Sequence, residues 1–162
     1  MTVFGGRSGN YDIYAQRVNA AGAQQWTADG VAMCTSAGNQ QYPTIIPDGA
    51  GGAIVTWYDL RSGANFDIYT QRLSAAGVPQ WTANGIALCT AVGDQDNPTI
   101  VTDGAGGAIV TWYDLRSGTA DIYAQRVNAT GSTQWTANGS PLCTAASSQY
   151  SPTIVSDGVG GA

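Results

Sequence analysis

Short apolar runs alternate with turns rich in glycine, asparagine and aspartate along the whole chain. Residues 108–113 read Ala-Ile-Val-Thr-Trp-Tyr, and β-branched and aromatic residues of this kind are typical of strands. The preceding residues 103–107 read Asp-Gly-Ala-Gly-Gly, a hairpin turn in which glycine adopts positive φ without steric cost. No segment spaces its apolar residues three and four apart over a helical length. The pattern predicts an all-β protein.

Four short strands are expected in each stretch of about 50 residues. In the third stretch they are residues 98–101, 108–113, 121–127 and a weaker run at 140–144. Both faces of the central runs are apolar, which indicates strands that are covered on both sides rather than on one.

The same pattern occurs three times. Asp-Ile-Tyr-x-Gln-Arg stands at residues 12–17, 67–72 and 121–126, with offsets of 55 and 54 residues, and residues 48–63 recur letter for letter at 103–118. Tryptophans and cysteines keep the same spacing: Trp26, Trp81, Trp135, Cys34, Cys89 and Cys143.

Four strands in about 54 residues, repeated in tandem, predict the blades of a β-propeller. A parallel β-helix is the rival, but its rungs are shorter and it has fewer hairpin turns. We therefore expect residues 1–162 to form three tandem blades.

The two ends of the sequence match different parts of one blade. Residues 1–9 align with 110–118, so that Thr2 corresponds to Thr111, while residues 157–162 stop where the other units continue into their second strand. We expect residues 1–35 to complete the blade begun at 145–162 of a partner chain, which closes the exposed edges.

The number of blades favours a homodimer. Three blades are too few for a ring, two chains give six blades, and three chains give nine, beyond the usual range of 4 to 8. The alternative, compatible with this assembly, is a piece of a longer natural propeller.

Composition excludes several classes of function. The chain has 11 acidic and 6 basic residues, a net charge of −5, and no His, Lys or Glu. Ser-His-Asp triads, Schiff bases and P-loop lysines are therefore excluded, and the acidic balance argues against nucleic acids and anionic membranes as partners. We expect no enzymatic activity, cofactor or metal. Residues 1–10 show no signal-peptide pattern.

Two Asp-x-Arg pairs are the most suggestive charged groups: Asp59 with Arg61, and Asp114 with Arg116. One interpretation is a polar ring at a propeller mouth that binds sugar hydroxyls. The favoured interpretation is an ion pair that braces each blade, because structural positions recur in every repeat whereas ligand-specific ones vary.

Positions that vary between matching repeats are better candidates for specificity. Three such dipeptides stand just before a proline, at the start of the presumed innermost strand, at residues 41–42, 96–97 and 150–151. Tyr42, Asn97 and Tyr150 are the candidate ligand-binding residues there, with carbohydrate as the candidate ligand.

The remaining recurrent residues are expected to be structural. The strand arginines are expected to bind carboxylate or carbonyl partners, among which the repeat aspartates are candidates. Each tryptophan is expected to dock on the adjacent blade rather than stack on a sugar, and each cysteine to act as a small buried hydrophobe. The arginines are Arg17, Arg72 and Arg126, and the aspartates are Asp12, Asp67 and Asp121.

Calcium binding is disfavoured. Each glycine-rich turn offers a single carboxylate, from Asp48, Asp103 or Asp157, whereas calcium loops supply several. Asp94 and Asp96 are the best local exception.

The units resemble the sialidase-like, Asp-box-related propeller repeats of secreted bacterial proteins. The matching elements are Pro-Thr-Ile, Asp-Gly-x-Gly-Gly, Trp-x-Asp-x-Arg, Asp-Ile-Tyr and a glycine turn before tryptophan, at residues 98–100, 103–107, 112–116, 121–123 and 131–135. The chain departs from the Asp-box at Ala20, where the aspartate belongs, and it lacks the glutamate that sialidases need. The resemblance implies the propeller fold and a secreted or cell-surface location, without sialidase activity.

Three functions follow in order of preference. The first is a non-enzymatic repeat scaffold that self-assembles for interaction or display, and the second is a lectin-like glycan-binding module. A sialidase-related hydrolase is the third, and the missing glutamate and histidine disfavour it.

Overall fold

The structure is a computed structural model that describes residues 2–6 and 9–162. These residues form eleven strands in three antiparallel sheets and contain no helix, which confirms the all-β prediction. In each sheet, strands that follow one another in the chain are hydrogen-bonded neighbours. The first sheet holds β1 (Thr2–Gly5), β2 (Asp12–Ala15) and β3 (Val31–Cys34).

The second and third sheets have four strands each. The second holds β4 (Gln40–Pro47), β5 (Ala53–Asp59), β6 (Asp67–Leu73) and β7 (Ile86–Cys89). The third holds β8 (Gln95–Thr102), β9 (Ala108–Asp114), β10 (Asp121–Val127) and β11 (Ser140–Cys143). The expected four strands per repeat are therefore present in these two sheets.

An aspartate closes the hairpin between β4 and β5 and the equivalent hairpin between β8 and β9. The Asp48 carboxylate accepts hydrogen bonds from the N–H groups of Ala50 and Gly52, both at 2.8 Å, which is an Asx turn. Gly52 is required because a Cβ there would collide with the carbonyl of Leu73 on β6. The turn thereby places the hairpin directly against the end of β6.

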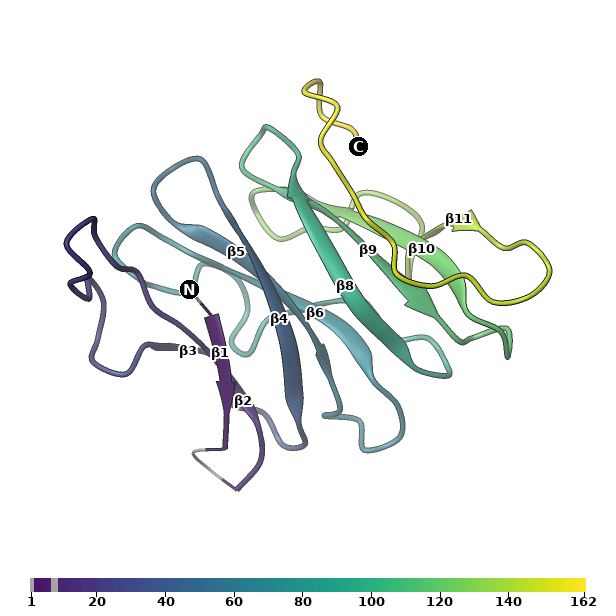
Figure 1. Ribbon diagram of the computed structural model, residues 1–162, viewed down its shortest axis with the longest axis horizontal. Helices are drawn as coiled ribbons and strands as arrows, with labels where there is room; N and C mark the ends of the chain where they lie inside the picture. The colour runs from purple at the N-terminus through teal and green to yellow at the C-terminus, as the bar shows by residue number, and fades with distance from the viewer. Residues whose placement is uncertain (1, 7–8) are drawn as a thin grey trace.

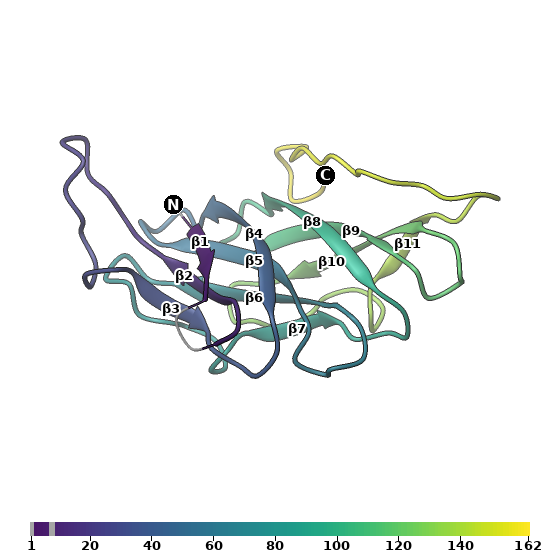
Figure 2. The same cartoon turned by 60° about the horizontal axis from the view of Figure 1, so that its bottom comes forward.

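The three sheets lie side by side in chain order, with β1, β4 and β8 next to one another (Figures 1 and 2). Because β5 is covered on both faces, its side chains divide between two cores. Val55 and Trp57 pack against the first sheet, whereas Ile54 and Tyr58 pack toward the third. Apolar burial between sheets thus holds the repeats together.

The two ends of this row differ from its middle. The first sheet has no counterpart of β4 or β8, and residues 144–162 contain no strand. Within the described residues the sheets form an open row, with β1 in the first sheet and the C-terminal segment running beside the third (Figure 1).

Candidate functional site

The Asp59–Arg61 pair lies at the boundary between the first and second sheets, with Asp59 buried and Arg61 partly exposed. Arg61 Nη2 lies 2.6 Å from Oδ2 of Asp59, whose side chain is inaccessible to solvent. The same carboxylate accepts hydrogen bonds from the Trp57 indole and from the backbone N–H of Arg61, both at 2.9 Å. These bonds explain the Trp-x-Asp-x-Arg spacing: one carboxylate fixes both an indole and a guanidinium.

Arg61 also joins neighbouring elements. Its Nη2 donates to the Asn84 carbonyl at 2.8 Å and to Cys34 Sγ on β3 at 3.2 Å, and its guanidinium lies 3.6 Å from the centroid of the Tyr69 ring. The ion pair and the bond to Asn84 lie within one repeat, as the favoured interpretation has it, and the bond to Cys34 in addition joins the second sheet to the first.

The third sheet repeats this arrangement. Arg116 Nη2 lies 2.6 Å from Asp114 Oδ2 and 3.1 Å from Cys89 Sγ, and it donates to the Asn138 carbonyl at 2.7 Å. Burial alone raises the pKa of Asp114, but hydrogen bonds from Arg116 and Trp112 outweigh it, so that the pKa lies below its usual value.

The cysteines take part in these braces. Cys34 and Cys89 are buried, and their thiols lie 3.7 Å from the carboxylates of Asp59 and Asp114. Burial raises the pKa of the Cys89 thiol to about 12, which keeps it protonated and unreactive. Cys143 is exposed, so the expectation of a small buried hydrophobe is wrong for Cys143 in this chain.

Arg17 and Arg72 donate to backbone carbonyls, those of Ala75 and Ala129, but the aspartate partners differ from the candidates Asp67 and Asp121. Arg72 pairs with Asp48, and Arg126 with Asp103, each at 3.0 Å, instead of pairing with Asp67 and Asp121. Five residues of strand, about 17 Å, separate each arginine from the candidate aspartate. The hairpin turn instead brings Asp48 or Asp103 to the end of the strand on which the arginine lies.

These ion pairs and turns also account for the carboxylates considered for calcium. Asp103 accepts from the N–H groups of Ala105 and Gly107 and pairs with Arg126. Asp94 accepts from the Phe66 N–H. Across residues 2–6 and 9–162, no group of three or more potential metal-ligating side chains is found.

Tyr42 and Asn97 lie at the same position in successive repeats. Each lies within a register shift near the start of its strand and has a left-handed φ of 49°, ahead of a proline. Together with Pro43, Thr44, Pro98 and Thr99 they line a hollow of about 300 Å³ between β4 and β8. The structure therefore brings two of the three variable candidate residues together.

Tyr150 is placed elsewhere. Its exposed ring packs edge-on against Tyr113 at 5.5 Å and does not line the hollow. Sequence reasoning missed two tyrosines here. Tyr58 stacks on Tyr42 at 5.1 Å, and Tyr113 forms a hydrogen bond with Asp96. In the sequence, the only sign of these two tyrosines is that they occupy the same position in the identical segments 48–63 and 103–118.

Comparisons with protein families, with curated proteins and with solved structures found no match to this chain. None of the described residues forms a helix long and apolar enough to cross a membrane.

Proposed function

We propose that this chain is a non-enzymatic repeat scaffold that self-assembles into a closed β-propeller and serves in interaction or display. One observation carries the proposal: residues 149–161 lie where the first strand and hairpin of a fourth sheet would lie, although no further strand accompanies them. Among the described residues, the first sheet, at the opposite end of the row, has no strand in this position.

Two hydrogen bonds support this placement, and the turn of the terminal hairpin is a third indication. The N–H of Gln149 donates to the Ala120 carbonyl at 2.7 Å. The N–H groups of Gln40 and Gln95, at the starts of β4 and β8, donate in the same way to the carbonyls of Tyr11 and Phe66. The Pro152 carbonyl accepts from Thr99 at 3.5 Å, repeating the bond from Thr44 to the Pro98 carbonyl at 3.3 Å.

The terminal hairpin has the same turn as its counterparts. Asp157 accepts from the N–H groups of Val159 and Gly161 at 2.8 and 2.9 Å, as Asp48 and Asp103 do in the complete sheets. The segment is thus preformed for strand pairing, and β1 offers an open edge to receive it.

The repeats specify the register of this pairing. Thr44 lies opposite Thr56, and Thr99 lies opposite Thr111. Because Thr153 and Thr2 correspond to these residues in the sequence, Thr153 of one chain is expected opposite Thr2 of the next.

Two chains, each completing the other's first sheet, give six blades. This number lies within the range of 4 to 8 that propellers use, whereas three sheets of one chain would have to curve more tightly. The contact is head-to-tail and closes by rotation, so each chain uses a different surface at each end.

Light scattering coupled to size exclusion tests the assembly. We expect a single species of about twice 16.7 kDa. A compact monomer at every concentration would contradict the proposal, and so would a broad distribution of masses, which indicates open chains of subunits.

Cysteine pairs test the register directly. Thr2→Cys with Thr153→Cys should give a disulfide-linked dimer on a denaturing gel, while the matched pair Thr44→Cys with Thr56→Cys should link within one chain. Thr2→Cys with Val155→Cys, two residues out of register, should link poorly. Equal linkage of both Thr2 pairs would argue against the predicted strand.

Glycan binding is a second candidate, favoured by the hollow between β4 and β8. Tyr42 is 55% exposed, and its ring lies beside the polar Asn97, a combination suited to a sugar ring and its hydroxyls. Glycan-array binding that is lost in Tyr42→Ala and kept in Val92→Ala, an exposed residue outside the hollow, would support it.

A further inference from the structure

Neighbouring sheets are joined by a tryptophan that lies over a glycine. The Trp26 indole donates to the Ala75 carbonyl at 3.0 Å, and its ring covers Gly77, where an added Cβ would lie only 2.8 Å from ring atoms. Gly77 has a φ of 79°, so the turn itself also favours glycine. Trp26 is thus seated on the turn of the next sheet.

The same joint occurs between the second and third sheets. The Trp81 indole donates to the Ala129 carbonyl at 3.1 Å, and a Cβ at Gly131 would lie 2.8 Å from its ring. Arginines reinforce both joints, because Arg17 donates to the Ala75 carbonyl and Arg72 to the Ala129 carbonyl. The same tryptophan-on-turn contact thus joins both pairs of neighbouring sheets. We call it the tryptophan joint.

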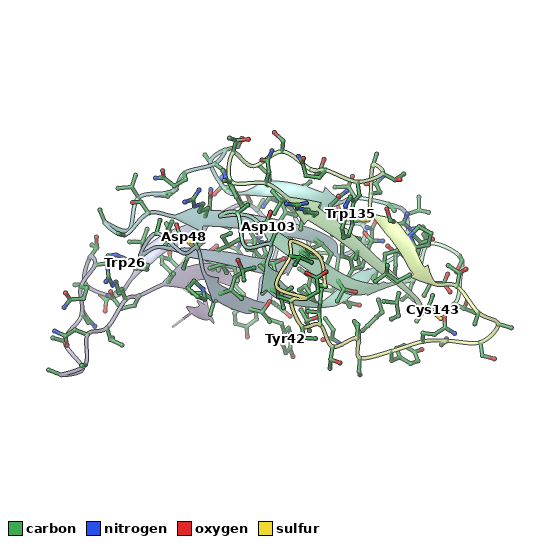
Figure 3. All side chains as sticks on the ribbon, turned by 90° about the horizontal axis from the view of Figure 1, so that it is seen from above. Trp26, Tyr42, Asp48, Asp103, Trp135 and Cys143 are labelled. Carbon is green, nitrogen blue, oxygen red and sulfur yellow. The ribbon has the colours of Figure 1, made fainter. Side chains whose placement is uncertain are left out.

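The third tryptophan has no such turn to cover. Trp135 is exposed at the C-terminal end of the row, far from Trp26 (Figure 3). Leu142 beside it is 60% exposed, whereas its counterparts Leu88 and Met33 are 2% exposed. Trp135 and Leu142 line an apolar hollow of about 280 Å³ with Ile122.

The matching turn is exposed at the other end of the chain. Gly22 has a φ of 77°, close to that of Gly77, and no atom lies within 4 Å of where its Cβ would be. Val18, at the base of this hairpin, is 49% exposed, whereas its counterparts Leu73 and Val127 are inaccessible. The turn around Gly22 thus has the same form as the turns that Trp26 and Trp81 cover, but it is exposed.

We infer that Trp135 docks on the Gly22 turn of a second copy of this chain, with its indole N–H donating to the Ala20 carbonyl. Ala20 corresponds to Ala75 and Ala129 in the repeat. The partner is a second copy of the chain because Trp135 corresponds to Trp26 and Trp81, and the Gly22 turn corresponds to the turns that these two tryptophans cover. The inference rests on the proposed assembly but concerns the faces of the sheets rather than the strand exchange.

Docking would cover further side chains. Cys143 corresponds to Cys34 and Cys89, which are each 1% exposed at the two existing joints. Its thiol should therefore become inaccessible when the second copy docks, together with Leu142 and Val18. Cys143 thus reports the state of this surface directly.

A matched pair of glycine variants tests the joint. Gly22→Asn should weaken self-association at least tenfold, because the new side chain meets the Trp135 ring. Gly63→Asn should not, because Gly63 has a similar φ of 72° and open space around it but lies in a different turn. Asparagine tolerates this backbone region, so both variants should fold, which circular dichroism checks. Equal association of the two variants would overturn the inference.

Thiol labelling provides the second readout. With Ellman's reagent, Cys143 should react quickly in dilute protein and slowly in the assembled protein, and Trp135→Ala should restore fast reaction. An assembled protein that links through Thr2→Cys and Thr153→Cys but leaves Cys143 reactive would overturn the tryptophan joint and leave the strand exchange standing. Absence of any assembly would overturn both.

Discussion

The thiol of Cys34 on β3 lies 3.7 Å from Oδ2 of Asp59 on β5, across the boundary between two repeats. The carboxylate also holds Trp57 and Arg61, so one buried aspartate organises three side chains from two sheets. The third sheet repeats the arrangement around Asp114.

Replacing this carboxylate should destabilise the fold. Asp59→Ala leaves the largely buried guanidinium of Arg61 without its counter-ion, which costs about 3 kcal/mol. Urea unfolding followed by tryptophan fluorescence measures the loss. Asp29→Asn is the control, because asparagine already occupies the corresponding positions 84 and 138; a similar loss in both variants would contradict the role assigned to Asp59.

The pH dependence of stability should reveal Asp67. Burial raises the pKa of Asp67 to about 6, well above its value of about 3.8 in an unfolded chain. The folded state therefore binds more protons between these values, and this residue's contribution to stability falls as the pH rises from 4 to 6. Asp67→Asn should be more stable than the wild type at pH 7 by about 3 kcal/mol, and equally stable near pH 3. Unfolding curves with a constant difference at both pH values would refute this.

The opposite trend is expected for Asp48 and Asp103. Although burial alone raises their pKa values, hydrogen bonds within the turn and the paired arginines outweigh it and lower them. Their contribution is present above pH 4 and is lost on further acidification. Asp103→Asn should flatten the fall in stability below pH 4, as measured by the urea midpoint against pH; an unchanged slope would contradict the ion pair.

Equivalent leucines should differ in what they stabilise. Leu88→Ala removes a fully packed side chain and should lower the free energy of unfolding by about 3 kcal/mol. Leu142→Ala should leave the unfolding of dilute single chains nearly unchanged and weaken self-association instead. Urea unfolding and sedimentation measured on both variants separate the two effects, and a large unfolding effect of Leu142→Ala would argue against an interface role.

An ion pair between copies is expected where the repeats place one within the chain. Arg72 and Arg126 pair with hairpin aspartates, and the corresponding residues left at the two ends are Arg17 and Asp157. Arg17→Gln and Asp157→Asn should each weaken association roughly two- to fivefold, less at high salt. Because the two residues act as a pair, the double variant should be no weaker than the worse single variant. Fully additive effects would show that they do not meet.

Local pattern was sufficient for the strands and the repeat. Asp-Gly-x-Gly-Gly turns and β-branched runs determine hairpins over a few residues, so the predicted run at residues 121–127 coincides with β10. The candidate site was less accessible to this reasoning. Variation between repeats makes Tyr42 and Asn97 candidates, but the stacking of Tyr58 on Tyr42 depends on how the side chains of two paired strands pack.

Amino-acid order alone determined the all-β class, the strand positions and the turns, because each depends on neighbouring residues. Only the tertiary structure decided that Arg72 pairs with Asp48 rather than Asp67, and that Trp26 and Trp81 lie over turns of the next sheet while Trp135 is exposed. Such choices depend on which surfaces the folded sheets bring within a few ångströms, and distance along the chain does not specify them.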